Sequence, residues 1–157
     1  HATDYLRFMT GLDVERAQAF YHHPQPYVLP LSSSIHYAFA GGATAVLSFL
    51  SSGGKNTGGQ GMPGGEPWFV IYCAEGTLAL HGYERVVVDG ETLYEANPYD
   101  PWLEQDRVFI EAVQSGDARA LLSDYRDALY SLGPVLAAWD SARRGGQCVD
   151  VGAFMGM

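Results

Sequence analysis

The chain begins with a stretch whose apolar residues recur at helical spacing. In HATDYLRFMTG the apolar positions 2, 5, 6 and 9 fall on one side of a helix, and Gly11 stands where a helix would end. No Ser, Thr, Asp or Asn precedes His1 to cap the free backbone N–H groups. The pattern predicts a helix over 1–10, and the missing cap leads us to expect that the natural chain continues before His1.

From residue 14 to residue 95 the pattern changes to the short apolar runs and alternation of β-strands. Paired glycines and an Asp-Gly step mark the turns, and Asp-Gly is the strongest short hairpin signal in the chain. The first predicted strand is residues 14–22. One strand is predicted before Gly41-Gly42 and one after it, the second of them ending near Phe49. Two more strands are predicted in PWFVIYCAEGTLALHG, separated at Glu75-Gly76, and a hairpin is predicted in RVVVDGETLYE around Asp89-Gly90.

After Asn97-Pro98 the helical period returns. In DPWLEQDRVFIEAVQSGD the large apolar residues fall near one face, which predicts a helix over 100–115. A second helix is predicted over 122–144, with Ser123 as its N-cap and with Pro134 expected to kink or split it. QCVDV is a possible last strand.

This order of elements predicts an α+β fold built as one domain over 1–157. We expect an open, predominantly antiparallel sheet of about five or six strands, with the helices packed on one face. Three helices cannot cover all the apolar strand residues, so an exposed apolar sheet face should associate with a second copy of the chain. Residues expected to contribute to that surplus are Phe39, Val46, Phe49, Phe69 and Ile71.

Residues 53–65, GGKNTGGQGMPGG, contain seven glycines and have little side chain to bury, so we expect a flexible loop. A glycine-rich turn that cradles phosphate is followed by a helix. Here the next segment, PWFVIYC, reads as a strand. The loop therefore predicts no phosphate or dinucleotide site.

Composition and charge narrow the classes of partner. The formal net charge is −9 and only nine Lys and Arg occur, so the chain has no basic face for nucleic acid or an anionic membrane. No apolar run spans a bilayer and no signal-peptide pattern opens the chain, which favours the cytoplasm. Cys73 and Cys148 form no CxxC pattern and are expected to be reduced and mostly buried.

Three histidines, His22, His23 and His36, raise the question of a metal site. Zinc requires three or four ligands at defined geometry, and no carboxylate or thiol is spaced to complete such a set. We therefore expect polar residues at a strand end and on a half-solvated face, with no metal. Asp4 and Arg7, three apart on the first helix, form either a surface ion pair or a contact that fixes a domain boundary.

Four stretches taken together resemble the C-terminal domain of the glucose–fructose oxidoreductase / inositol dehydrogenase / rhizopine-catabolism (Gfo/Idh/MocA) family. HATDYLRFMTG is similar to the family's His-x-x-Asp-x-x-Arg helix ending in Gly, and IHYAFAGGATAVLSF to its strand–Gly-Gly–strand hairpin. FVIYCAEGTLAL resembles the family's Gly-Thr-Leu strand pair. DRVFIEAVQSGD and LGPVLAAWDSARRGGQCVDV resemble its two terminal helices and the Ser-Ala-x-x-Gly-x-x-Val ending.

The resemblance implies a parent enzyme with two domains. Family members are NAD(P)-dependent oxidoreductases in which a Rossmann domain binds the dinucleotide and the C-terminal sheet shapes the substrate pocket and builds the oligomer interface. His1 matches the His of the family's Asp-x-x-x-His motif, which implies a catalytic role that is latent in this chain, and no cofactor-binding residue is expected here. The implied contacts to a sugar, cyclitol or related polyol are His22, His23, Tyr27, His36 and Tyr37.

Two alternatives to this interpretation stay open at the level of sequence. The first is a stand-alone, non-catalytic binding or dimerisation module of the same fold. The second is a small enzyme with an unrelated α+β fold that works through the His22-His23 region. The sequence distinguishes neither NAD from NADP nor one polyol from another.

Overall fold

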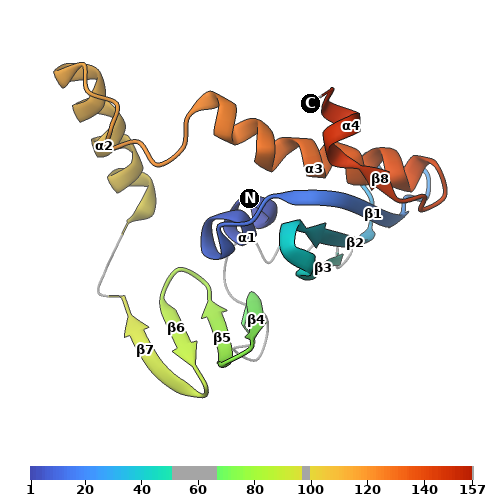
Figure 1. Cartoon of the computed structure of the whole chain (residues 1–157), viewed down its shortest axis with the longest axis horizontal. Helices are drawn as coiled ribbons and strands as arrows, with labels where there is room; N and C mark the ends of the chain where they lie inside the picture. Colours follow the sequence, from blue (N-terminus) through green and yellow to red (C-terminus); the bar gives the residue numbers. More distant parts are fainter. Residues whose placement is uncertain (51–66, 97–99, 157) are drawn as a thin grey trace. The chain divides into compact units, whose positions relative to one another are not determined.

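The computed structural model describes residues 1–50, 67–96 and 100–156. The chain forms two compact units, one of His1–Lys55 with Leu121–Met157 and one of Asn56–Ala120. Figure 1 labels their elements in chain order. The glycine-rich segment 53–65 lies outside the described residues, and its flexibility stays a prediction, as does the single domain over 1–157.

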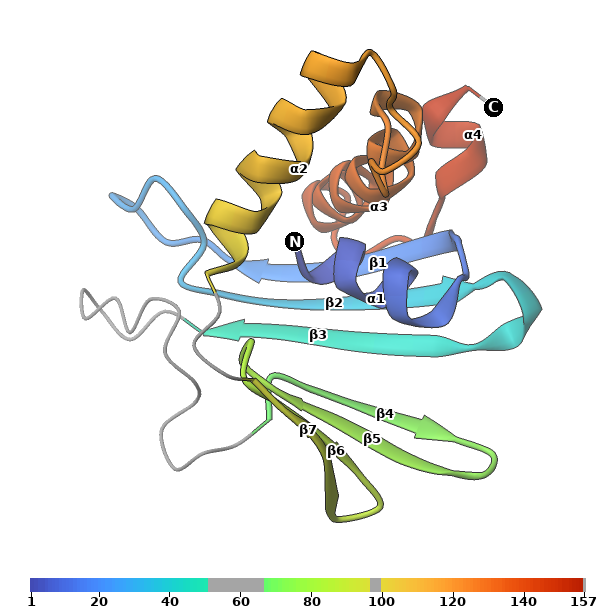
Figure 2. The same ribbon diagram turned by 90° about the vertical axis from the view of Figure 1, so that its left-hand side faces the viewer.

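The first unit contains a four-stranded antiparallel sheet with the strand order β3-β2-β1-β8. The three long strands lie side by side in Figure 2, and a short 3-10 turn, Ala40–Gly42, joins two of them. Helix α3 packs along β1, and both α1 and α4 contact α3. The elements are α1 (Ala2–Thr10), β1 (Val14–His22), β2 (Ser32–Phe39), β3 (Thr44–Leu50), α3 (Tyr125–Arg143), β8 (Val149–Asp150) and α4 (Val151–Met155).

The strand register assigns the side chains of this sheet to two faces. Residues opposite each other in an antiparallel pair point to the same side of the sheet. Ala17 is opposite Tyr37, and Ala19 is opposite Ile35, and all four are buried. The alanines of β1 leave room for α3, whose Ala137, Ala138 and Ser141 are also fully buried. The core of this unit is therefore the contact of α3 with the small side chains of β1.

Ser141 completes the hydrogen bonding of β1 where its neighbouring strand ends. Strand β8 pairs only with Arg16 and Ala17. Two residues further along β1, the backbone N–H of Ala19 donates to the Ser141 hydroxyl at 3.0 Å. Because this site is buried, a hydroxyl from α3 supplies the acceptor that water would supply elsewhere.

Arg7 connects α1 to α3. Its guanidinium pairs with Asp127 on α3 and with Asp13 ahead of β1, each at an N–O distance of 2.8 Å, and it donates to the Ser131 hydroxyl. Asp4 accepts from that same hydroxyl at 2.6 Å. Of the two roles expected for Asp4 and Arg7, the ion pair between them is replaced by a network in which both residues reach α3, and the domain-boundary role stays a prediction.

The second unit contains a second antiparallel sheet in simple sequence order, β4-β5-β6-β7. Asp89 and Gly90 both have positive φ at the turn between its last two strands, as an Asp-Gly hairpin requires. The Asp89 carboxylate accepts from the backbone N–H of Thr77 at 2.7 Å, which fixes this turn to the neighbouring strand. The elements are β4 (Phe69–Cys73), β5 (Gly76–His81), β6 (Arg85–Val88), β7 (Glu91–Glu95) and α2 (Pro101–Ser115).

One face of this second sheet is apolar along three strands. Ile71 is opposite Leu78, which is opposite Val88, and Phe69 is opposite Leu80, which is opposite Val86. All of these side chains are half-buried, and none is fully buried. We call the set Phe69, Ile71, Leu78, Leu80, Val86 and Val88 the second-sheet apolar face.

The predicted α+β class and the antiparallel pairing are confirmed, and so are the three helices. The number of sheets differs: the described residues contain eight strands in two sheets of four, instead of five or six strands in one. Hydrogen bonds between strands define a sheet, and the apolar pattern of a strand does not say which neighbour it pairs with.

The end regions of the helices also differ from the prediction. Asp124, not Ser123, caps α3 by accepting from the Asp127 backbone N–H at 2.7 Å. The helix continues through the buried Pro134 and is not split there. The short helix α4 was not predicted, because five residues are too few to show a helical period.

Candidate functional site

His1, the predicted catalytic residue, is exposed at the beginning of α1. It occupies the N-cap position, and no side-chain hydrogen bond caps the helix. Its carbonyl oxygen accepts from the Tyr5 backbone N–H at 2.9 Å. His1 is therefore at a helix terminus and accessible, and its catalytic role stays a prediction.

His22, His23 and Tyr27 lie at the end of β1 and in the loop that follows, and all three are exposed. His23 donates through Nε2 to the Tyr27 carbonyl oxygen at 2.8 Å. Its ring centroid also lies 6.5 Å from that of Trp139 on α3. The structure thus brings His23 and Tyr27 together, while His22, the last residue of β1, lies on the sheet face that points away from α3.

His36 and Tyr37 are neighbours in sequence but lie on opposite faces of the sheet. The Tyr37 side chain is 2% exposed, and its hydroxyl shares a 3.1 Å hydrogen bond with Thr3 on α1. Burial raises the pKa of Tyr37, so its hydroxyl stays protonated. His36 is exposed, and its Nε2 lies 3.2 Å from the Ser34 hydroxyl. The Tyr37 side chain is therefore packed in the core and points to the opposite face of the sheet from His36.

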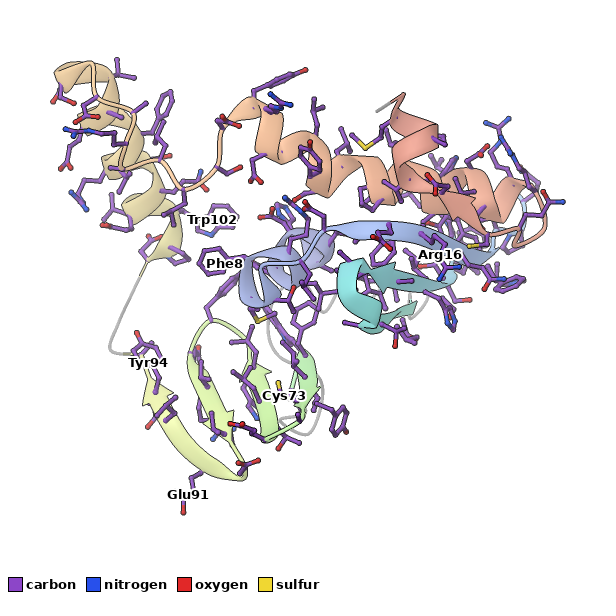
Figure 3. All side chains as sticks on the ribbon, viewed as in Figure 1. Phe8, Arg16, Cys73, Glu91, Tyr94 and Trp102 are labelled. Atoms are coloured by element: carbon purple, nitrogen blue, oxygen red, sulfur yellow. The ribbon has the colours of Figure 1, made fainter. Side chains whose placement is uncertain are left out.

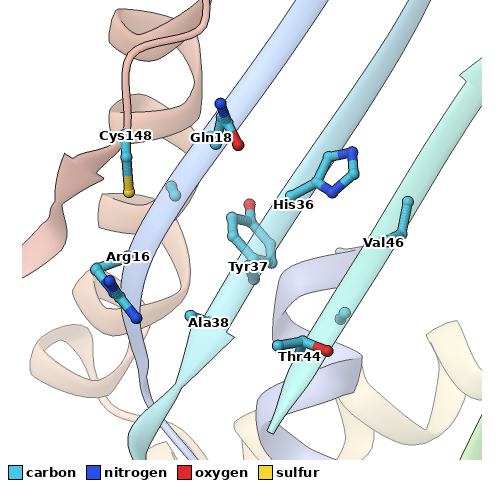
Figure 4. Close-up of a pocket in the computed structure, with 10 residues that line it drawn as sticks. Arg16, Gln18, His36, Tyr37, Ala38, Thr44, Val46 and Cys148 are labelled. Atoms are coloured by element: carbon cyan, nitrogen blue, oxygen red, sulfur yellow. The ribbon is translucent and has the colours of Figure 1, made fainter. Parts of the chain in front are cut away.

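The face of the first sheet that points away from α3 is largely polar. Of the apolar residues expected on an exposed face, Val46 lies here and is exposed, whereas Phe39 is buried on the helix side. A shallow depression of about 300 Å³ occupies one half of this face (Figure 4). Among its lining residues are Arg16, Gln18, His36, Thr44, Val46 and Cys148.

A second depression, of about 420 Å³, occupies the other half of the same face. Its lining includes Phe20, His22, Ser32, Ser34 and Ser48, which we call the Phe20 depression. Only His22 of this set was singled out in the sequence. The alternation of SSSIHYAF, with Ile35 and Tyr37 turned inward, is the signal that would have found the two serines of β2.

The structure also bears on the cysteines, on a metal site and on membrane-spanning helices. Cys73 on β4 (Figure 3) and Cys148 are both exposed and free, so the expectation of buried thiols is wrong. Within residues 1–50, 67–96 and 100–156, no group of three His, Cys, Asp or Glu side chains is arranged to hold a metal ion. None of the helices described has the length and apolarity that crossing a bilayer requires.

Comparison with known proteins identifies relatives by structure and not by sequence. No protein-family model and no curated protein sequence matches this chain. An oxidoreductase from Thermotoga maritima has a TM-score of 0.74 at 19% identity, over 98% of this chain and 43% of its own. An oxidoreductase from Agrobacterium radiobacter, solved with NAD+, L-tartaric acid and magnesium, has a TM-score of 0.67 at 23% identity, over 98% of this chain and 47% of its own.

A third solved structure is the aldose-aldose oxidoreductase from Caulobacter crescentus in complex with glycerol. Its TM-score is 0.64 at 15% identity, over 92% of this chain and 43% of its own. This chain therefore shares its fold with part of several oxidoreductases and spans less than half the length of these three. The resemblance stated from the sequence is confirmed at the level of fold, and the alternative of an unrelated α+β fold is set aside.

Proposed function

We propose that the chain is the C-terminal, substrate-binding and oligomerisation domain of a cytoplasmic NAD(P)-dependent oxidoreductase of the Gfo/Idh/MocA type, acting on a sugar, cyclitol or related polyol. The observation that carries the proposal is a fold shared over nearly the whole chain with less than half of each of these three oxidoreductases. A dinucleotide in one neighbour and glycerol in another support the cofactor and the substrate class.

In the parent enzyme a Rossmann domain supplies the dinucleotide, and hydride passes between the nicotinamide and a carbinol or carbonyl carbon. His1 acts on the proton of the reacting oxygen, since an imidazole titrates near neutral pH. His23 and Tyr27 lie within the region expected to meet the substrate, and their polar groups suit hydroxyls. The chain alone is expected to bind neither NAD nor NADP tightly.

The test uses the complete gene product that carries this chain. We expect it to reduce NAD or NADP with at least one member of a panel of aldoses, cyclitols and linear polyols. In that protein His1→Ala should lower kcat by about 10²–10⁴-fold, which is the usual contribution of a general acid or base. His81→Gln, a histidine of the second unit, is the matched control and should leave kcat unchanged. No reduction with any member of the panel would contradict the proposal.

The oligomer is proposed to form through the second-sheet apolar face. This face differs from the one expected from the sequence, since it excludes Phe39 and keeps Phe69 and Ile71. Six neighbouring apolar side chains on three strands are typical of a surface that associates, and a second copy of the chain presents the same face to it. The measurement that tests this association is given in the Discussion.

A further inference from the structure

The outer side of α3 carries a row of large apolar residues that lies outside the core. The side of the helix that meets β1 is made of small residues, and Ala137, Ala138 and Ser141 are fully buried there. On the opposite side, large apolar side chains recur at alternating steps of three and four residues, and each is between 37% and 50% exposed. We call this row the α3 seam, and its members are Leu129, Leu132, Leu136 and Trp139.

The spacing of the α3 seam is that of a helix that packs lengthwise against another helix. Apolar residues at alternating steps of three and four stay on one side of a helix and interdigitate with an equivalent row on a partner. The fold already holds this helix in place, since Asp124 caps its beginning and Ser141 bonds to β1 near its end. Trp139 is also fixed, because its ring packs edge-on against that of Tyr21 at 5.2 Å. A seam held in this way loses little conformational freedom on association.

A second copy of α3 fits the seam if the two helices run antiparallel about a two-fold axis level with Pro134. Leu132 then lies opposite Leu136 of the second copy, so leucines fill the centre of the contact from both sides. Leu129 lies opposite Trp139 of the second copy, so the large indole meets a smaller leucine and not a second indole. In this register every side chain of the seam meets an apolar side chain.

The residues beside the seam agree with the same antiparallel register. On one flank the exposed Arg126 comes level with Asp140 of the second copy, so opposite charges face each other twice. Asp140 also pairs with Arg144 of its own helix at 2.8 Å, and a carboxylate has lone pairs for both arginines. On the other flank Ala128 is level with Ala142 of the second copy, and such small side chains let two helices approach closely.

We propose that two copies of the chain associate through their α3 seams, with the two helices antiparallel. A row of exposed large apolar side chains is typical of a surface that associates, and the Arg126–Asp140 complementarity selects a second copy as the occupant. A parallel pair would lose this complementarity, because Arg126 and Asp140 would lie about 21 Å apart along the helix axis. The seam belongs to the first unit and the second-sheet apolar face to the second, so this contact does not rest on the proposed function.

The test is oxidative cross-linking of two single-cysteine variants. Both carry Cys73→Ser and Cys148→Ser, because the native thiols are exposed, and Ile71→Lys, which places a charge on the second-sheet apolar face. An equimolar mixture of Leu129→Cys and Trp139→Cys should give a disulfide-linked dimer, since opposing seam residues come within the roughly 7 Å between Cα atoms that a disulfide allows. Either variant alone should stay monomeric, because its own two copies would lie about 15 Å apart along the axis.

A charged substitution in the seam gives a second measurement. Leu136→Glu, added to both single-cysteine variants, places a charge opposite Leu132 of the second copy and should lower the yield of linked dimer by about tenfold. Phe8→Glu, at an exposed position on α1, is the matched control and should leave the yield unchanged. Equal yields for Leu136→Glu and Phe8→Glu would overturn the inference.

Three further outcomes would also overturn it. Linked dimer from either single-cysteine variant alone would indicate a parallel or random contact, and no linked dimer from the mixture would show that the seams do not meet. The same mixture made with the complete gene product should also link, and a dimer formed by this chain only would show that another segment covers the seam. None of these measurements involves dinucleotide, turnover or the second sheet, so the proposed function is tested separately.

Discussion

At the scale of the residue, the role of a strand side chain depends on which face of the sheet it points to. His36 and Tyr37 were expected to contact one substrate, yet strand geometry sends them to opposite faces. Ser141 shows the converse, because a hydroxyl distant in sequence meets a backbone N–H that β8 is too short to reach. Residue type alone therefore does not show which polar side chains face solvent and which satisfy a buried backbone group.

Ser141→Ala should lower the free energy of unfolding of the first unit by about 1–3 kcal/mol, because the Ala19 N–H is then buried without an acceptor. Urea denaturation followed by circular dichroism measures this change. Ser48→Ala is the matched control, since Ser48 is exposed on β3, and should change stability by no more than about 0.5 kcal/mol. Equal stabilities of the two variants would show that the Ser141 hydrogen bond contributes little.

At the scale of the element, two connections position α3. One is the Gly145-Gly146 turn after the helix, which lies against Phe20 on β1. The other is Arg7, which joins α1 to Asp127 near the beginning of α3. These contacts fix both ends of the helix over the sheet, while the alanines of β1 set how closely it approaches.

The two glycines of this turn allow a matched comparison. Both have positive φ, so an added Cβ strains each backbone by about 1–2 kcal/mol. Only at Gly146 does that Cβ also meet the Phe20 ring. Gly146→Ala should therefore destabilise the protein by about 1–3 kcal/mol more than Gly145→Ala. Thermal unfolding of the two variants measures the difference, and combining Gly146→Ala with Phe20→Ala should remove most of the excess.

The Arg7–Asp127 contact predicts a dependence of stability on pH. The hydrogen bond from Arg7 lowers the pKa of Asp127 below its usual value. A carboxyl whose pKa is lower in the folded state stabilises the fold above its unfolded pKa, near 3.9, and loses that contribution as the pH falls through the folded pKa. Between about pH 4 and pH 2, Arg7→Gln should therefore lose less stability than the parent chain.

Urea midpoints at several pH values in this range measure the effect. Arg143→Gln, which changes an exposed arginine in the last turn of α3, is the control and should follow the parent curve. A parallel course for Arg7→Gln and the parent chain would contradict the assignment of this titration to the Arg7–Asp127 pair.

At the scale of the whole molecule, the chain divides its apolar surface between two sheets. The first sheet buries one face under α3 and keeps a polar opposite face. The second sheet has an apolar face whose six side chains are only half-buried. Of the apolar strand residues noted in the sequence, Val46 and Phe49 are exposed in the first unit, and Phe69 and Ile71 lie on the second-sheet apolar face, which carries the proposed association.

Ile71→Lys should shift the chain towards monomer, because a charge on the second-sheet apolar face would have to be desolvated on association. Sedimentation velocity at high micromolar concentration measures the change. Val70→Lys is the control, since Val70 precedes Ile71 on β4 and points to the opposite side of the sheet. A strictly monomeric parent chain at that concentration would rule out the proposed association.

Hydrophobic period and turn residues in the sequence were enough to determine the α+β class, the three longer helices and the hairpin at Asp89-Gly90. These features are local, because neighbours along the chain decide helical spacing, caps and turn conformations. The stretches that resemble oxidoreductase domains are of the same kind, since each is a short motif in a fixed order. His1, His22 and His36 were also recognisable as exposed polar groups for this reason.

The division of the strands into two sheets, the burial of Tyr37 and the surroundings of Phe20 were decided by tertiary structure alone. Each depends on pairing between strands or on contact with α3 and the turn after it. The contacts of β1 with α3 and this turn join residues more than a hundred positions apart. The apolar pattern fixes which residues avoid water but not which partner covers them. That choice is made by packing and by backbone hydrogen bonds that the whole fold has to satisfy together.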